Sequence, residues 1–192
     1  MAVMARPLTV DDLLRLGSDA RVEVVGGEVV TMTPVGGLHN WIAKRIAWAL
    51  DAYMEEHKSG LVFTDSLLYV LSEKDDSVRI ARVPDASYIR TADIPADWDF
   101  ERPYPGAPTL AVEVISPDDQ FEDVVQKVGD YFAAGTAEVW VALPRQKALY
   151  RYRQGQSVIE TYRAGESMDA SDLFPGLALA LAEVFTLPDL GR

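Results

Sequence analysis

The chain of 192 residues contains no cysteine. This absence excludes a disulfide framework and any metal site that uses thiolate ligands. A metal centre in this protein would have to rely mainly on carboxylate and carbonyl oxygens. Such oxygen ligands favour Mg²⁺, Mn²⁺ or Ca²⁺ over zinc.

The sequence also lacks long apolar runs and an excess of basic residues. No run approaches the ~20 apolar residues that a membrane-spanning helix needs, and residues 1–7 hold no signal-peptide core. We therefore expect a cytoplasmic protein. Eighteen Lys and Arg against 30 Asp and Glu give a net charge of −12. This balance disfavours strong nonspecific binding to nucleic acid, so an enzyme acting on nucleic acid would need a local basic patch or a bound divalent cation.

Length and residue pattern predict one α+β domain spanning residues 1–192. Thr9, followed by Asp12, has the capping-box pattern of a short N-terminal helix. Two β-branched runs around Gly26 and Gly27 predict a β-hairpin, with Val22, Val24 and Val29 on a core face and Glu23 on the opposite one.

Beyond the hairpin, the period becomes helical from Leu38 to about His57 and again over residues 122–134. Short strands are expected at 61–64, 67–71, 78–83, 85–89, 110–115 and 138–143, before a C-terminal hairpin of 147–153 and 157–163. Because a strand, a helix and a strand follow one another between residues 110 and 143, these two strands should be parallel neighbours in a right-handed crossover.

The strand from Leu110 to Ile115 is apolar on both faces, which is typical of a central strand covered on both sides. Glu113 lies in its middle. Desolvating an unpaired carboxylate there would cost several kcal/mol, so Glu113 must be neutral, paired or bound to a cation.

Two residues could partner Glu113. Asp85 begins the preceding strand, and Lys127 lies at the edge of the apolar stripe of the following helix. If the two strands pair antiparallel, the carboxylates of Asp85 and Glu113 can converge and share a divalent cation. The alternative is that Asp85 caps a turn after Pro84 while Glu113 meets an arginine.

The order Pro84-Asp85, Glu113-Val114-Ile115 and Lys127 resembles the PD-(D/E)XK nuclease superfamily and, within it, the Uma-two family of restriction-endonuclease-like proteins. The resemblance extends from the Glu23 hairpin to Trp140. It implies a restriction-endonuclease-like mixed β-sheet flanked by helices, with an N-terminal helix and β-hairpin and an extra C-terminal hairpin.

This resemblance implies a Mg²⁺- or Mn²⁺-dependent endonuclease that hydrolyses phosphodiester bonds, with DNA favoured as substrate and a homodimer as the assembly. Asp85, Glu113 and the carbonyl of Val114 would hold the metal. The superfamily's usual lysine, two residues after the acid, is Ile115 here, so its role would pass to Lys127. Glu23 would be a helper carboxylate, or alternatively an exposed hairpin acid.

For substrate binding, His39 lies near the expected site, although a histidine in a first helical turn often serves in packing. The best basic cluster is Arg145, Lys147, Arg151 and Arg153. It could follow a phosphate backbone, or it could protect an edge strand against aggregation.

Two other functions remain open: a non-catalytic nuclease-fold protein that keeps the site as an ion-pair cluster, and a carboxylate-pair hydrolase such as a glycosidase, which would leave Lys127 unexplained.

Overall fold

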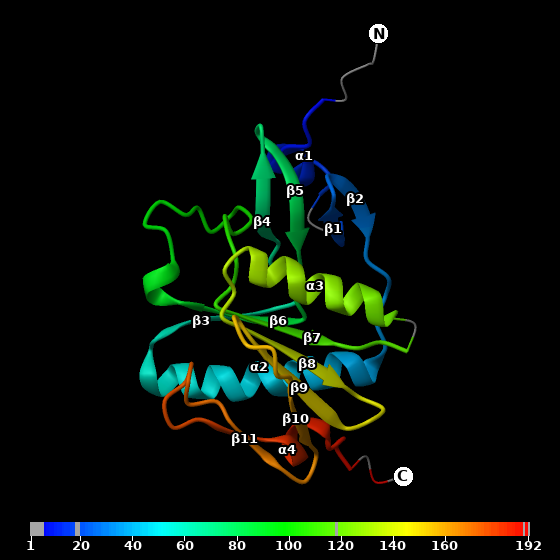
Figure 1. Ribbon diagram of the computed structural model, residues 1–192, viewed down its shortest axis with the longest axis vertical. Coiled ribbons are helices and arrows are strands. Elements are labelled where there is room, and N and C mark those ends of the chain that lie inside the picture. Colours follow the sequence, from blue (N-terminus) through cyan, green and yellow to red (C-terminus); the bar gives the residue numbers. More distant parts are fainter. Residues whose placement is uncertain (1–5, 18–19, 118, 190, 192) are drawn as a thin grey trace.

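The computed structural model describes residues 6–17, 20–117, 119–189 and 191, which form an α+β fold with three β-sheets (Figure 1). Residues 1–5, part of the segment assessed for a signal peptide, lie outside these ranges. Within the described ranges, no helix has the length and apolarity needed to cross a membrane.

The largest sheet has six strands in the order β10-β9-β8-β7-β6-β3. Its strands are β3 (Gly60–Thr64), β6 (Ala86–Arg90), β7 (Leu110–Val114), β8 (Glu138–Leu143), β9 (Ala148–Arg153) and β10 (Glu160–Arg163). Strand β7 pairs antiparallel with β6 and parallel with β8, which confirms the predicted parallel pairing. The C-terminal hairpin of β9 and β10 is also confirmed.

Two helices cover the opposite faces of this sheet: α2 (Gly37–His57) and α3 (Phe121–Ala133) (Figure 1). Leu50 of α2 packs in the same cluster as Trp140 of β8, whereas Tyr131 of α3 packs with Val141 of β8. All five residues of β7 are buried between these two layers, as its apolar sequence predicts. Because side chains alternate along a strand, Glu113 points to the α3 face.

A second sheet of four strands lies beyond α3 in the order β2-β1-β5-β4 (Figure 1). It consists of β1 (Val22–Val25), β2 (Glu28–Thr31), β4 (Tyr69–Lys74) and β5 (Ser77–Arg82), beside the short helix α1 (Val10–Leu14). The capping box of Thr9 and Asp12 forms as predicted.

The hairpin of β1 and β2 is confirmed, but the prediction of which residues form its core face is partly wrong. Val24 is fully buried, whereas Val29 is 42 % exposed because β2 is an edge strand whose four residues all face solvent. Glu23, on the other side of β1, is buried as well. Both faces of β1 are therefore covered, one by apolar residues and one by charged partners.

The C-terminal segment completes the core below α2. It comprises β11 (Ser167–Asp169), β12 (Ala178–Ala180) and α4 (Leu181–Phe185). The long loop between β6 and β7 contains one 3₁₀ turn, η1 (Thr91–Asp93). In this loop Trp98 packs edge-on against Phe63 and Tyr104, whereas Phe100 is 65 % exposed.

Candidate active site

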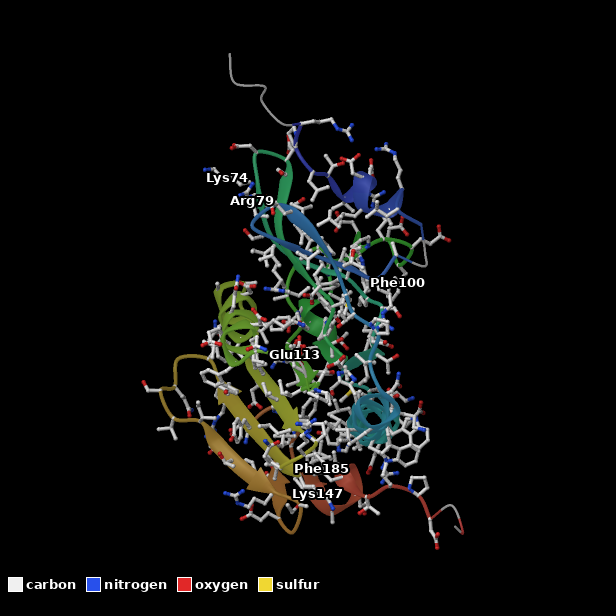
Figure 2. The ribbon with its side chains drawn as sticks, turned by 90° about the vertical axis from the view of Figure 1, so that its right-hand side faces the viewer. Lys74, Arg79, Phe100, Glu113, Lys147 and Phe185 are labelled. Atoms are coloured by element: carbon white, nitrogen blue, oxygen red, sulfur yellow. The ribbon has the colours of Figure 1, made fainter. Side chains whose placement is uncertain are left out.

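A cavity of about 200 Å³ lies between the two sheets, at the carboxyl end of β7. Its ionisable lining residues are Glu23, His39, Asp85, Glu113, Asp119 and Lys127. They come from β1, α2, the β5–β6 connection, β7, the segment before α3, and α3. Figure 2 shows Glu113 about midway along the molecule, below the four-stranded sheet. Only the tertiary fold brings these segments together.

Asp85 is held at the cavity by the pairing of β6 with β7. Its amide donates to the carbonyl of Val112 at 3.0 Å, and its Oδ2 accepts a 2.7 Å hydrogen bond from the amide of Val114. Both Asp85 and Glu113 line this cavity, because antiparallel neighbours bring the start of β6 to the end of β7.

His39, in the first turn of α2, is a direct neighbour of Asp85. Its Nε2 lies 3.3 Å from Oδ2 of Asp85. Burial lowers the pKa of His39, but the hydrogen bond and charge of Asp85, together with the charges of Asp119 and Glu113, outweigh burial, so the pKa lies above its ordinary value. The charge of Asp85 thus favours the imidazolium form, which would help to fix the orientation of this carboxylate.

Glu113 accepts one hydrogen bond at each carboxylate oxygen. Tyr131 donates to Oε1 at 2.8 Å, and Lys127 donates to Oε2 at 3.1 Å. Burial raises the pKa of Glu113 to about 7; the ammonium of Lys127 opposes this rise, while the charges of Asp85 and Glu23 add to it. Glu113 therefore exchanges a proton near neutral pH, unlike an exposed glutamate.

Lys127 bridges two acids. Its Nζ lies 3.1 Å from Oε2 of Glu113 and 3.3 Å from Oε1 of Glu23. Burial lowers the pKa of Lys127, but the two carboxylates raise it by more, so the ammonium persists at neutral pH. Ile115 packs with the apolar residues under α3. The cation beside Glu113 therefore comes from the helix and not from the position two residues along the strand.

Glu23 is buried, which excludes the exposed-acid alternative. Its Oε2 accepts a 2.8 Å hydrogen bond from Arg82, the last residue of β5. The same guanidinium donates to Oδ2 of Asp130 on α3 at 2.6 and 3.0 Å. Sequence reasoning missed Arg82; its signal was a charged residue at the end of the strand that precedes Pro84, next to the apolar Ala81 and Val83.

The structure does not support the predicted basic strand as a substrate surface. Arg151 is buried and is the direct cross-strand partner of Trp140 in the pairing of β8 with β9. Both side chains therefore lie on the α2 face of the sheet, opposite Glu113. Its guanidinium pairs with Glu138 at 2.6 Å. Arg153 pairs with Asp172 at 2.6 Å and with Glu160 at 2.7 Å. These carboxylates neutralise the two cations, a partnership that strand alternation alone could not reveal.

The remaining two members of that cluster, Arg145 and Lys147, lie exposed in the turn between β8 and β9. Figure 2 shows Lys147 well below Glu113, at the level of Phe185. A larger cavity of about 760 Å³ beside α1 is lined by Leu13 and Phe100 among others. It contains none of the acids that surround Lys127.

The raised pKa of Glu113 predicts a pH-dependent stability difference. A carboxyl group with a folded pKa of about 7 and an ordinary value of 4.5 stabilises the folded state below pH 4.5 and loses this contribution as pH rises through 7. Relative to Glu113→Gln, which mimics the protonated acid, the wild-type protein should lose up to about 3 kcal/mol across this window. Urea unfolding of both proteins in EDTA measures this loss. A difference in the free energy of unfolding that stays constant between pH 4 and 8 would contradict the raised pKa.

A mixed sheet with two acids at the ends of adjacent central strands, and a lysine on the covering helix, places the chain among the restriction-endonuclease-like α+β proteins. Residues 10–182 match the Uma2 family, whose description is "Putative restriction endonuclease". The chain belongs to this family.

A solved structure from Anabaena variabilis ATCC 29413, described as "a putative nuclease belonging to DUF820", has the same fold, with a TM-score of 0.75. The sequences are 19 % identical, and the match covers 93 % of this chain and 98 % of that chain. No curated protein matches the sequence.

Proposed function

We propose that this protein is a divalent-metal-dependent endonuclease that hydrolyses phosphodiester bonds in nucleic acid, with DNA as the favoured substrate. The observation that carries the proposal is the position of Lys127, whose ammonium bridges Glu113 and Glu23 in the cavity that Asp85 also lines. Family membership supports the same reaction class. The homodimer remains a prediction.

The oxygen donors at this site suit a hard cation. Asp85 and Glu113 would hold it together with the carbonyl of Val114. Among the described residues, Oδ1 of Asp85 accepts no hydrogen bond, and each oxygen of Glu113 accepts one and keeps a second lone pair. No group of three or more acids or histidines with metal-site spacing occurs in the described ranges. Two carboxylates are sufficient for Mg²⁺, because this ion usually keeps several waters and binds one or two carboxylates.

A cation bound there would polarise the phosphate and lower the pKa of an attacking water. Lys127 keeps its proton at Nζ and would donate a hydrogen bond to an oxygen of the scissile phosphate or orient the water. Glu23 and Glu113 fix the ammonium from two sides, and Arg82 in turn holds Glu23. His39 orients Asp85. These contacts exist before substrate binds, so little reorganisation is needed during the reaction.

A second candidate function is a non-catalytic nuclease-fold protein. The observation that favours it is the complete pairing of the cluster: Arg82 with Glu23, Lys127 with both Glu23 and Glu113, and Tyr131 with Glu113. Such a network can persist as a structural ion-pair cluster without any cation. The two functions differ in whether a divalent cation binds.

Metal binding and cleavage test the proposal together. Mg²⁺ or Mn²⁺ should raise the thermal midpoint of the wild-type protein, because a ligand at about 100 times its Kd adds about 2.7 kcal/mol to the stability. The same cations should support nicking of a supercoiled plasmid. Asp85→Asn, which keeps the side chain's shape and removes its charge, should lose both effects. Identical midpoints with and without cation, together with intact plasmid, would favour the non-catalytic alternative.

A further inference from the structure

We propose that the nucleic-acid strand leaves the active-site cavity along the N-terminal half of α2, where Lys44 binds a phosphate that is not the scissile one. The inference rests on the proposed nuclease function and names the substrate path of the same site. It replaces the basic strand that the sequence suggested with a different surface.

A second cavity continues the active site in this direction. It measures about 280 Å³, and its lining includes Asn40, Lys44 and Thr64. Val35, His39 and Asp85 line both this cavity and the active-site cavity. The two cavities therefore adjoin at these residues, and we call the second one the α2 groove. A strand with its phosphate at Lys127 would pass the shared residues His39 and Asp85 to reach Lys44.

Lys44 is the one Lys or Arg that lines the α2 groove in the described part of the chain. It makes no ion pair with a described acid. Instead, its Nζ lies 4.1 Å from the ring centroid of Trp41 and 4.6 Å from that of Trp48. The three residues share one side of α2 because they are three and four positions apart. The indole rings stabilise and position the ammonium without cancelling its charge, so it stays available to an anion.

The acids in the same groove already have partners. Asp65 pairs with Arg21 at 2.6 Å, and Asp85 is engaged by His39 and by the amide of Val114. The local charge around Lys44 is thus less acidic than the net charge of −12 suggests. In contrast, Arg151 and Arg153 on β9 form ion pairs with acids on the other face of the sheet. The α2 groove is therefore the better phosphate path next to Glu113.

Equilibrium binding in EDTA tests the path without cleavage. The probes are a fluorescent DNA duplex and an RNA duplex of the same sequence, and the tighter one is titrated between about 50 and 200 mM salt. Lys44→Gln should weaken binding roughly eightfold at about 0.1 M salt and make the log–log salt slope shallower by about 0.9, the value for one lost phosphate contact. Lys44→Arg should restore most of the affinity.

Lys147→Gln is the matched control, since it removes the same charge from an exposed turn far from Glu113 (Figure 2). It should leave the affinity and the salt slope unchanged. Thermal midpoints verify that each variant is folded. Wild-type affinity in Lys44→Gln, equal losses in both variants, or no binding of either probe by the wild-type protein would overturn the path.

A parallel cleavage assay with Mn²⁺ separates the path from the nuclease function. If the wild-type protein cleaves and Lys44→Gln changes neither the binding affinity nor the KM, the path is refuted and the nuclease function stands. Binding that depends on Lys44 without any cleavage supports the path and refutes the nuclease.

Discussion

Replacing Lys127 by methionine should reduce phosphodiester cleavage at least about a hundredfold while the protein stays folded. Methionine keeps much of the lysine's bulk but removes the ammonium that lies 3.1 Å from Glu113 and 3.3 Å from Glu23. The fold should tolerate this change, because Glu113, with a pKa of about 7, can take up a proton once its cation is gone. Plasmid nicking rates with saturating Mn²⁺ measure the loss.

Metal affinity distinguishes a catalytic lysine from a structural one. Without Lys127, Glu113 has one competitor fewer for a cation, so Mn²⁺ should bind to Lys127→Met as well as to the wild-type protein or more tightly. Lys74→Met, an exposed lysine at the tip of the β4–β5 hairpin, is the control and should cleave normally. Unchanged cleavage by Lys127→Met would remove Lys127 from the mechanism and weaken the nuclease proposal with it.

Replacing Arg82 by methionine should lower the free energy of unfolding by about 3–5 kcal/mol, which is typical when one partner of a buried ion pair is removed. Arg82 is 5 % exposed and joins Glu23 of β1 to Asp130 of α3. Without the guanidinium, the partners that the carboxylate of Glu23 keeps among the described residues are Lys127 and the amide of Val83. Urea unfolding at neutral pH in EDTA measures the change.

The origin of this loss in stability can be tested by also removing the carboxylates that lose their cation, those of Glu23 and Asp130. In Arg82→Met combined with Glu23→Gln and Asp130→Asn, no unpaired acid is left behind, and a large part of the lost stability should return. A loss below about 1 kcal/mol in the single variant would mean that the ion pairs add little to stability. An equal loss in the triple variant would instead assign the effect to packing of the arginine side chain.

Local patterns were sufficient for much of the fold. The capping box at Thr9, the helical period that ends at His57 and the apolar strand around Glu113 each depend on residues close together in the chain. These patterns work because the backbone repeats of helix and strand set which side chains share a face. The strand–helix–strand order also indicated the parallel pairing of β7 with β8, since a connecting helix returns the chain to the end of the sheet where the first strand began. The placement of Asp85, Glu113 and Lys127 followed from the same local order and from the family resemblance.

The charge partners were decided by tertiary structure alone. Arg82 reaches Glu23 across 59 residues of sequence and Asp130 across 48, and it does so only because the four-stranded sheet packs beside α3. The same packing buries Glu23, which an isolated hairpin would leave in solvent. Arg151 meets Glu138 from the next strand, so a cation that looked available in the sequence is neutralised. Lys44 lines a groove because Val35, His39 and Asp85 meet beside it. Periodicity assigns a side chain to a face of its element, but its electrostatic partners depend on which elements pack against that face.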